Sequence, residues 1–507
     1  MKKISIIAAD IGAGGGRVIL AYFDGKKILL NEVFRFNNNQ IFLGNYLYWD
    51  FLSIFKNVLD GFFIVSKKNN GKKINSIGID TWGADFGLIN IYGDLIENPV
   101  TYRDKRTESI SKYIYEIISH DELFRLTSAS ANNYCALFQL YYLYRFKNET
   151  SRMINKYLPI PNLINYFLTG EIITEPSILT GSQFFDVKEK IYLRSVLEKT
   201  GIPLKILPEI TQPGKVIGKL KDSIKEHAGL LGDINISLVC GHDTASAVNG
   251  IPFEDDLNDS CFVIAGTWAV IGFETNKPLI SQEIINSNFT NWATYKENII
   301  FVKIFNCFYF IQEFKKNWDL EDGKIIDFDE LYSNIGEVDL HNYPMVNLSS
   351  KRLFSTDKSM TDRIADYLKL TNQKIQNSRE DMVKTLLLNV VLETKLAIEE
   401  LEKFSSKKFK KVYIVGGGSK NRVFCSWVSD CLGKEVITGY AESTSCGNII
   451  LQLIALGEIK TLQEGREVIR NSFGLKIYSP NSNFKTDWCK LIEKYKNLKK
   501  IEEDVLK

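Results

Sequence analysis

Two aspartates stand where apolar runs end, which is a usual position for catalytic side chains in α/β sheets. Asp10 follows the run 4–9, and Asp243 lies between the run 236–240 and a helical stretch that begins near Ala245. A carboxylate in such a place can accept a proton from a hydroxyl group or hold Mg²⁺ through water. We therefore take Asp243 as a candidate general base and Asp10 as a candidate magnesium ligand. The alternatives are structural: Asp10 would cap a hairpin, and Asp243 would cap a helix.

Three glycine-rich turns suit the binding of phosphate groups, at residues 14–16, 266–267 and 416–418. Phosphates need several backbone N–H donors at close range, and glycine leaves them uncovered. Arg17, directly after the first turn, would meet a phosphate. No GxxxxGK[ST] motif is present, which excludes a P-loop, and a GxGxxG reading fails because Arg17 replaces the third glycine and a strand follows. Any one of these turns alone is equally well explained as a tight turn.

The segment 80–85 has the composition of a site for a polyol. Trp82 offers an aromatic face, Asp80 and Asp85 offer carboxylates, and Gly83 allows close approach. His242, next to the candidate base, would either hydrogen-bond a sugar hydroxyl or simply pack.

The elements that must hold these residues recur along the chain. A strand, a glycine turn and a returning strand occur once in each half, which predicts an α/β fold with a duplicated scaffold. Ser378, with Asp381 three residues on, is expected to cap a long helix. The predicted strands are 4–9, 17–23, 27–36, 76–80, 236–240, 260–265, 268–273, 411–415 and 435–438. The other predicted features are a turn at 11–16, a helix-rich middle at 109–170, a helix at 421–432 and a solvated Lys-rich helix from Lys494 onward.

Charge and composition favour a small partner. The 507 residues carry 63 Lys and Arg against 61 Asp and Glu, a net charge of +2, and no long basic run. A nucleic-acid binder would normally show a basic excess or a basic face. The eight cysteines and four histidines show no metal-site spacing, so we expect free thiols in a reducing cytoplasm.

Apolar runs in the sequence predict neither export nor a membrane span. The run after Met1 ends at Asp10, below the length of a signal-peptide core. The longest run, 299–314, is broken by Lys303 and Asn306 and is shorter than a membrane helix. A soluble cytoplasmic protein is expected, as a monomer or small homo-oligomer, with no nucleic-acid or membrane partner.

Taken together and in order, these motifs resemble the FGGY carbohydrate kinases of the actin-like superfamily, and in particular those that act on L-rhamnulose. The resemblance covers about residues 4 to 480 and implies two actin-like (ribonuclease H-like) α/β domains, 1–246 and 247–507, flanking a cleft for ATP and sugar. The matching segments are 10–17, 35–38 with 49–50, 78–83, 102–106, 241–247, 266–268, 415–418 with Asn421, and 442–448.

The resemblance also implies a reaction and roles for individual residues. ATP would phosphorylate L-rhamnulose at its 1-hydroxyl to give L-rhamnulose 1-phosphate in L-rhamnose catabolism, with Asp243 as the base and Mg²⁺ at Asp10. The nucleotide would be bound by Asp10, Ala13, Gly14, Gly15, Gly16, Arg17, Gly266, Thr267, Gln312, Gly417, Gly418 and Asn421. The sugar would be bound by Trp82, Gly83, Asp85, His242, Asp243, Thr244 and Asn306.

The chain departs from the family pattern in three places. Ile264-Ala265 stand where the family has serine, and residues 291–294 (Asn-Trp-Ala-Thr) replace an Asn-Glu-Gly-Gly segment. The asparagine expected eight residues before Gln312 is Ile304, and Asn306 takes its role only if the alignment shifts. The alternatives are therefore a kinase for another ketose, such as L-fuculose or L-xylulose, or a catalytically weak sensor of sugar and nucleotide.

Overall fold

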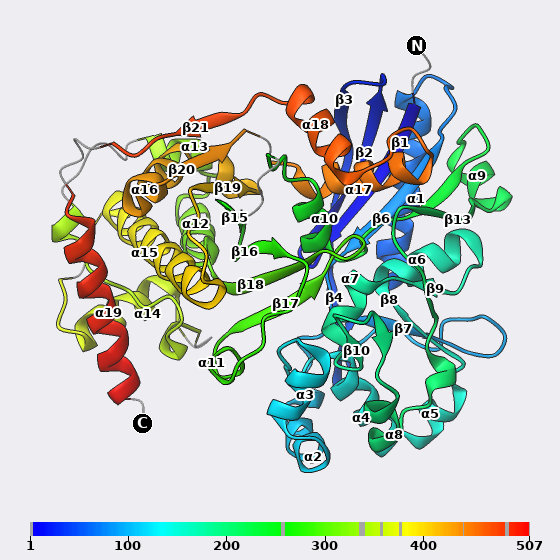
Figure 1. Ribbon diagram of the computed structural model, residues 1–507, viewed down its shortest axis with the longest axis horizontal. Helices are drawn as coiled ribbons and strands as arrows, with labels where there is room; N and C mark the ends of the chain where they lie inside the picture. The colour runs from blue at the N-terminus through cyan, green and yellow to red at the C-terminus, as the bar shows by residue number, and fades with distance from the viewer. Residues whose placement is uncertain are drawn as a thin grey trace. The chain divides into compact units, whose positions relative to one another are not determined.

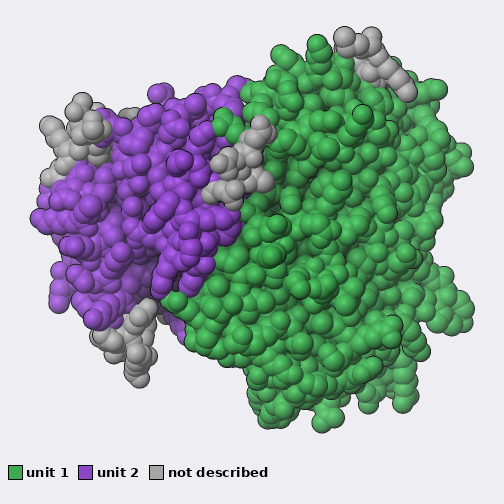
Figure 2. Space-filling model, viewed as in Figure 1, with its two compact units in different colours: residues 1–255, 274–301, 442–473 green, residues 256–273, 302–441, 474–507 purple. Residues whose placement is uncertain are grey.

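The computed structural model describes residues 4–254, 259–333, 340–354, 358–374, 378–439, 441–481 and 486–505. The chain forms two compact units, coloured separately in Figure 2. Unit 1 comprises residues 1–255, 274–301 and 442–473, and unit 2 comprises residues 256–273, 302–441 and 474–507. Two segments from the second half of the chain thus pack with unit 1. The domain boundary after residue 246 stays a prediction.

Unit 1 is built on a six-stranded sheet in the order β13-β14-β6-β1-β2-β3. Strand β1 pairs antiparallel with β2 and parallel with β6, β14 is parallel to β6, and β13 is antiparallel to β14. Strands of the sheet are β1 (Ile4–Gly12), β2 (Gly15–Phe23), β3 (Ile28–Asn37), β6 (Ser76–Thr81), β13 (Lys215–Lys219) and β14 (Asn235–Leu238). The short strands around it are β4 (Gln40–Leu43), β5 (Tyr46–Trp49), β7 (Phe86–Ile89), β8 (Lys156–Pro159), β9 (Ile173–Thr174), β10 (Phe185–Asp186), β11 (Ile191–Tyr192) and β12 (Glu209–Ile210).

A second sheet has the order β17-β18-β16-β15-β19-β20-β21. Strand β15 pairs antiparallel with β16 and parallel with β19, β20 is parallel to β19, and β21 is antiparallel to β20. Strands β15, β19, β20 and β21 have the same order and relative directions as β1, β6, β14 and β13 of unit 1. The duplicated α/β scaffold is therefore confirmed. The strands are β15 (Ser260–Ala265), β16 (Trp268–Thr275), β17 (Phe289–Ala293), β18 (Ile299–Asn306), β19 (Lys411–Val415), β20 (Glu435–Thr438) and β21 (Lys476–Tyr478).

Helices surround both sheets (Figure 1). In unit 1 they are α1 (Phe51–Lys68), α2 (Ile110–Ile117), α3 (His120–Thr127), α4 (Ala136–Phe146), α5 (Asn148–Met153), α6 (Ile160–Thr169), α7 (Pro176–Leu179), α8 (Arg194–Thr200), α9 (Asp222–Ala228), α10 (Asp243–Asn249), α11 (Gln282–Ile285), α17 (Ser443–Ala455) and α18 (Leu462–Ser472). In unit 2 they are α12 (Tyr309–Asp322), α13 (Phe328–Ser333), α14 (Met360–Leu370), α15 (Arg379–Ser405), α16 (Arg422–Leu432) and α19 (Trp488–Val505). No helix in the described part of the chain is long and apolar enough to cross a membrane.

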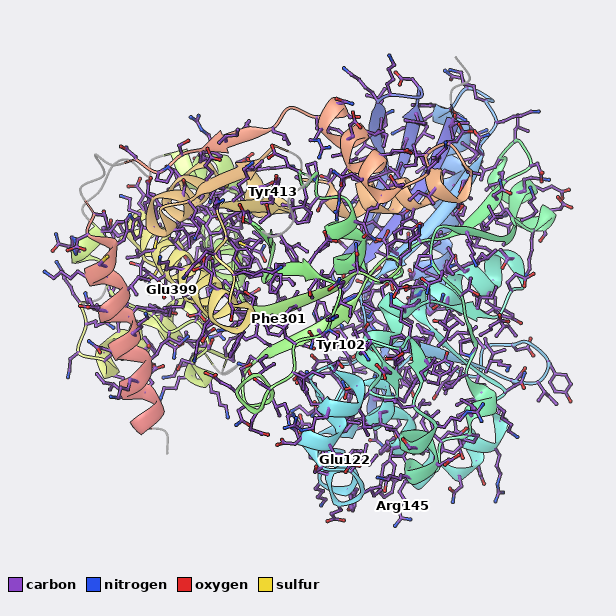
Figure 3. All side chains as sticks on the ribbon, in the orientation of Figure 1. Tyr102, Glu122, Arg145, Phe301, Glu399 and Tyr413 are labelled. Atoms are coloured by element: carbon purple, nitrogen blue, oxygen red, sulfur yellow. The ribbon has the colours of Figure 1, made fainter. Side chains whose placement is uncertain are left out.

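Local sequence explains several of these elements. The side chain of Ser378 accepts a hydrogen bond from the backbone N–H of Asp381 at 3.0 Å, which confirms the predicted cap of α15. Tyr413, on β19, is almost completely buried and is labelled in Figure 3.

The eight cysteines are free thiols, and Cys489 is the exposed one among them.

The first glycine turn is shorter than the predicted 11–16, because β1 and β2 continue through most of it and pair from Gly12 to Gly15. Only Ala13 and Gly14 form the turn. Gly15 and Gly16 are strand residues. A Cβ at Gly15 would lie 2.5 Å from the backbone oxygen of Phe36, and a Cβ at Gly16 would collide with the Phe36 ring. The close packing against β3 is therefore sufficient reason for glycine at both positions.

Helix α17 packs closely on helix α10, which begins at Asp243. A Cβ at Gly447 would collide with the backbone oxygen of Ser246, and a Cβ at Gly250 would collide with that of Ser443. In Figure 1 the orange helix α17 lies against the blue strand β1. The segment 442–473 thus supports the helix that carries the candidate base.

Gly447→Ala is expected to lower the stability of the protein by about 1–3 kcal/mol, because the added methyl group forces α10 and α17 apart. Gly181→Ala is the control, since a Cβ at Gly181 meets no atom within 4 Å. Urea denaturation followed by circular dichroism measures both. Equal midpoints for the two variants would contradict the close helix contact.

Candidate active site

Three aspartates converge at the ends of adjacent elements in unit 1. In the sheet register Asp10 stands opposite Asp80 of β6, and Thr81 forms a bridge with His242. Asp243 is the first residue of α10, which begins two residues earlier than the sequence indicated. The sequence argument offered Asp80 only as a carboxylate of the polyol segment 80–85, although it ends a buried run just as Asp10 does.

Crowding and burial make these carboxylates hard to ionise together. Burial, together with the negative charge of Asp10, raises the pKa of Asp243 to about 7. The same two causes hold the pKa of Asp80 well above its ordinary value, and Asp243 adds to them. The side chain of Asp243 nevertheless keeps 32% of its exposure. It is therefore a carboxylate that both titrates near neutrality and can be reached.

Hydrogen bonds fix the orientation of Asp243. Its Oδ1 accepts from the backbone N–H of Thr244 at 2.6 Å and from the Thr244 hydroxyl at 3.3 Å. This contact uses one carboxylate oxygen. The sequence placed Thr244 among the sugar-binding residues, and its sugar contact stays a prediction.

Arg17 provides positive charge beside Asp10. Its Nη2 and Nε donate to Asp10 Oδ2 at 2.6 and 3.0 Å, and its Nη1 forms an ion pair with Glu442. Burial acts to lower the pKa of Arg17, but Asp10 and Glu442 together hold it above its ordinary value. Glu442 comes from the far end of the sequence, so sequence reasoning quoted it only as part of a motif and gave it no role. Contact of Arg17 with a phosphate stays a prediction.

His242, next to Asp243 in the sequence, contacts Gly83 and Trp292. A Cβ at Gly83 would lie 3.2 Å from His242 Nε2, and the rings of His242 and Trp292 meet edge to face with centroids 4.9 Å apart. Burial lowers the pKa of His242 to about 4, so the ring is neutral at pH 7. The 3.6 Å separation between His242 Nε2 and Asp243 Oδ1 is thus no ion pair at that pH. Trp292 comes from the segment that departs from the family pattern, and sequence reasoning did not foresee its contact with His242.

Trp82 and Asp85 are largely buried, with 5% and 2% of their surface exposed. The indole N–H groups of Trp82 and Trp49 both donate to Asp85 Oδ2, at 2.9 and 2.7 Å. Tyr102, labelled in Figure 3, packs against Trp49 with ring centroids 6.5 Å apart. The buried Trp49, Trp82 and Asp85, with the half-buried Tyr102 packed against them, stabilise the loop after β6. Direct sugar contact by Trp82 or Asp85 stays a prediction.

In unit 2, the turn between β15 and β16 brings Thr267 and Gln312 together. The Thr267 hydroxyl donates to Gln312 Oε1 at 2.8 Å, at the surface. Backbone N–H groups at the start of α12 donate to the turn: Cys307 and Tyr309 to the Thr267 carbonyl at 3.1 and 3.2 Å, and Phe308 to the Gly266 carbonyl at 3.2 Å. The turn is therefore rigidly attached to the helix that carries Gln312.

The glycine loop after β19 contains one open position. Gly416 has φ +78°, and a Cβ there would lie 2.9 Å from the backbone oxygen of Ala265. A Cβ at Gly418 would lie 2.5 Å from the Phe308 ring, whereas one at Gly417 would meet nothing within 4 Å. Asn421 accepts from the backbone N–H of Phe424 at 3.0 Å and caps α16. Gly417 is thus the residue of this loop whose backbone a ligand could reach.

Two asparagines of the divergent region have structural partners. Asn291 donates to the backbone oxygens of Ser128 at 2.7 Å and Leu279 at 3.0 Å. Asn306, at the end of β18, donates to the backbone oxygen of Leu348 at 3.4 Å and is 6% exposed. Its role in binding sugar stays a prediction.

The donor atoms around Asp10 suit magnesium bound mainly through water and phosphate. Within the described ranges no group of three or more His, Cys, Asp or Glu residues forms a metal cage. Mg²⁺ typically takes only one or two carboxylates and completes its shell with water and substrate phosphates. Asp80 Oδ1 is buried and accepts no hydrogen bond in the structure, which leaves it able to accept one from a metal-bound water. The residues therefore fit such an ion.

Comparison with known families defines the class of protein. The N-terminal domain model of the FGGY family of carbohydrate kinases matches residues 5–250, and the C-terminal domain model matches residues 261–456. The chain belongs to the FGGY family of carbohydrate kinases and is an ATP-dependent sugar kinase.

Similar proteins and structures agree with this class. The chain is 32% identical to the rhamnulokinase of Oceanobacillus iheyensis, over 93% of this chain and 98% of that protein. It is 29% identical to the rhamnulokinase of Bacteroides thetaiotaomicron, over 94% and 96%. Among solved structures, a ligand-bound xylulose kinase from Lactobacillus acidophilus superposes with a TM-score of 0.78 at 18% identity, covering 98% of each chain. Glycerol kinase from Plasmodium falciparum with ADP gives 0.77 at 17% identity, covering 99% and 98%. These structures share the fold.

Asp85→Asn is expected to reduce the pH dependence of stability. Burial raises the pKa of Asp85 from 3.8 to about 6, so between these values the folded chain keeps a proton that the unfolded chain has lost. Stability therefore falls as pH rises through this window. Asparagine keeps an oxygen for the two indoles without the charge. The variant should thus gain up to about 3 kcal/mol relative to the wild type between pH 4 and 7.

Urea midpoints measured for both proteins from pH 4 to 7 test this expectation. A constant difference between the two proteins across that range would show that Asp85 is not a source of the dependence.

Proposed function

We propose that this chain transfers the γ-phosphoryl group of ATP to the 1-hydroxyl of L-rhamnulose, with Asp243 as the general base. The observation that carries the proposal is the state of Asp243: it is partly exposed, it begins helix α10, and its pKa is raised to about 7. A base is most effective when its pKa lies near the working pH. The names of the similar proteins supply the substrate.

Residues of unit 1 would perform the proton transfer. Deprotonated Asp243 takes the hydroxyl proton as the oxygen attacks phosphorus, while the Thr244 contacts hold one carboxylate oxygen in place. Neutral His242 can donate to or accept from a sugar hydroxyl. Arg17 lies beside Asp10 and would place its positive charge near the phosphates, where it would stabilise the negative charge on the transferred group.

The nucleotide would use the residues predicted from sequence in the glycine turns. Thr267, Gln312 and Gly417 are the accessible members in unit 2, and Gly14 is the exposed glycine of the first turn. Asp10, with Asp80 close by, would hold Mg²⁺ through water. When bound, the ion neutralises charge on the phosphates.

A ketose panel with Asp243→Asn tests the proposal. ADP release should be fastest with L-rhamnulose, ahead of L-fuculose, L-xylulose and D-xylulose. Asp243→Asn should lower kcat by about 10²- to 10⁴-fold, because the proton acceptor is lost. Asp222→Asn is the control, since Asp222 also begins a short helix of unit 1 but is exposed and pairs with Lys225. Turnover of another ketose alone would revise the substrate, and no turnover with measurable sugar binding would indicate a sensor.

The pH dependence of the reaction should follow Asp243. The active form is the ionised one, so kcat/KM for the ketose should rise with pH and reach half its plateau near pH 7. Initial rates between pH 5.5 and 8.5 at saturating ATP measure this. A flat profile across that range would argue against Asp243 as the titrating base.

Trp292→Ala should weaken sugar binding by removing the ring that holds His242. An aromatic contact of this kind is worth about 0.5–1.5 kcal/mol, which corresponds to roughly a 2- to 13-fold rise in KM for the ketose. Trp292→Phe keeps a ring and should show a smaller change, and KM for ATP should stay constant in both variants. An unchanged KM for the ketose in Trp292→Ala would remove Trp292 from the sugar site.

A further inference from the structure

Glu175 is a fully buried carboxylate immediately before the short helix α7. Its Oε2 accepts from the backbone N–H of Ser177 at 2.7 Å. Its Oε1 accepts from three donors: the Ser177 hydroxyl at 2.7 Å, the backbone N–H of Ile178 at 2.9 Å and the backbone N–H of Gly241 at 3.0 Å. The last of these lies 66 positions along the chain, directly before His242 and Asp243.

The peptides before Asp243 are held from two sides. Glu175 takes the N–H of Gly241, while the carbonyl of Gly241 accepts from the backbone N–H of Thr81 at 2.8 Å. The N–H of His242 donates to the Ser177 hydroxyl at 3.3 Å, and that hydroxyl in turn donates to Glu175. One carboxylate thus anchors two successive peptides, one of them through Ser177. The orientation of these peptides sets the direction in which the side chains of His242 and Asp243 point.

The donors around Glu175 favour an ionised carboxylate. All four are N–H or O–H groups that point at its two oxygens, and a carboxylate is the form that only accepts. Burial raises the pKa of Glu175, while its hydrogen bonds with Ser177, Ile178 and Gly241 act in the opposite direction. Retaining a buried charge is costly unless several donors solvate it, and here they do.

Capping α7 does not by itself explain a buried carboxylate. Helix α11 also has four residues and lies in the same unit, and it is capped by a hydroxyl alone: Ser281 accepts from the backbone N–H of Ile284 at 3.2 Å. Unlike Ser281, Glu175 also accepts a hydrogen bond from outside its own helix, that from the backbone N–H of Gly241. That bond connects α7 to the residues that carry the candidate base.

We propose that Glu175 is a positioning residue for the phosphoryl transfer, acting through Gly241 and Ser177 to align Asp243 and His242. The inference rests on the proposed function only for the identity of the reaction. Glu175 reaches no substrate in this account. Small misplacements of catalytic groups cost large factors in rate, so the effect belongs in kcat.

Glu175→Gln tests the assignment while keeping the shape of the side chain. An NH₂ group at the Oε1 position would lose the bonds from Gly241 and Ile178, and one at the Oε2 position would face the Ser177 N–H, so in either orientation the anchor loses at least one N–H partner. We expect kcat with the best ketose of the panel to fall by at least about ten-fold, with KM for ATP within about two-fold of the wild type. Ser177→Ala should give a smaller fall in kcat of the same kind. Ser281→Ala removes a comparable cap elsewhere in unit 1 and should leave kcat unchanged.

Two outcomes would overturn the assignment. One is a kcat for Glu175→Gln equal to that of Ser281→Ala. The other is a loss of activity in Glu175→Gln that disappears once rates are corrected for the folded fraction. If Glu175→Gln does not fold, Ser177→Ala decides by the same criteria.

Histidine NMR separates this inference from the proposed function. The chain has four histidines, and the His242 ring resonances are assigned by comparison with His242→Gln. Glu175→Gln should shift the His242 resonances in the unliganded protein, whereas Ser281→Ala should not. This readout holds even if the wild type phosphorylates none of the ketoses, a result that would overturn the function alone. Unshifted His242 resonances in Glu175→Gln would overturn the positioning role.

Discussion

The electrostatic crowding of Asp10, Asp80 and Asp243 is the constraint on which the rest of the site depends. Three carboxylates face one another at the end of the unit 1 sheet, and Arg17 provides compensating charge at Asp10. Like charges so close cannot all ionise at neutral pH. The three carboxylates therefore differ: Asp10 is paired with Arg17, the pKa of Asp80 lies well above its ordinary value, and the pKa of Asp243 is about 7. A kinase needs carboxylates in different roles, because one accepts the hydroxyl proton while another lies near the phosphates and the metal.

This arrangement is held by a segment from the far end of the chain. Asn448 Nδ2 donates to Asp80 Oδ2 at 2.5 Å, and Glu442 pairs with Arg17. Both residues belong to the segment that packs α17 onto α10 without space for a methyl group at Gly447. Residues around position 445 therefore contribute to the electrostatics of residues 10 and 80.

Sequence reasoning predicted the secondary-structure elements better than it predicted the contacts between residues far apart in sequence. The apolar runs of β1 and β15, the Ser378 cap and the loop that begins at Gly416 are local signals, and the structure has them where they were expected. The contacts that Asp80, Asn448 and Glu175 make in the site were missed, because they join residues far apart in sequence. The turn at 11–16 was predicted too long because the sequence pattern does not show that Phe36 excludes side chains at Gly15 and Gly16. The proposed reaction came from the resemblance to a family, because no local sequence pattern by itself indicates it.

The most direct test of this account is the pKa of Asp243 itself, measured by ¹³C NMR of the aspartate carboxyl groups in the unliganded protein, with the resonance assigned from Asp243→Asn. The account predicts a pKa of about 7 in the wild type and a lower value in Asp10→Asn, because a neighbouring negative charge is removed. A pKa near 4 in the wild type, or one that Asp10→Asn leaves unchanged, would contradict the claim that carboxylate crowding prepares the base.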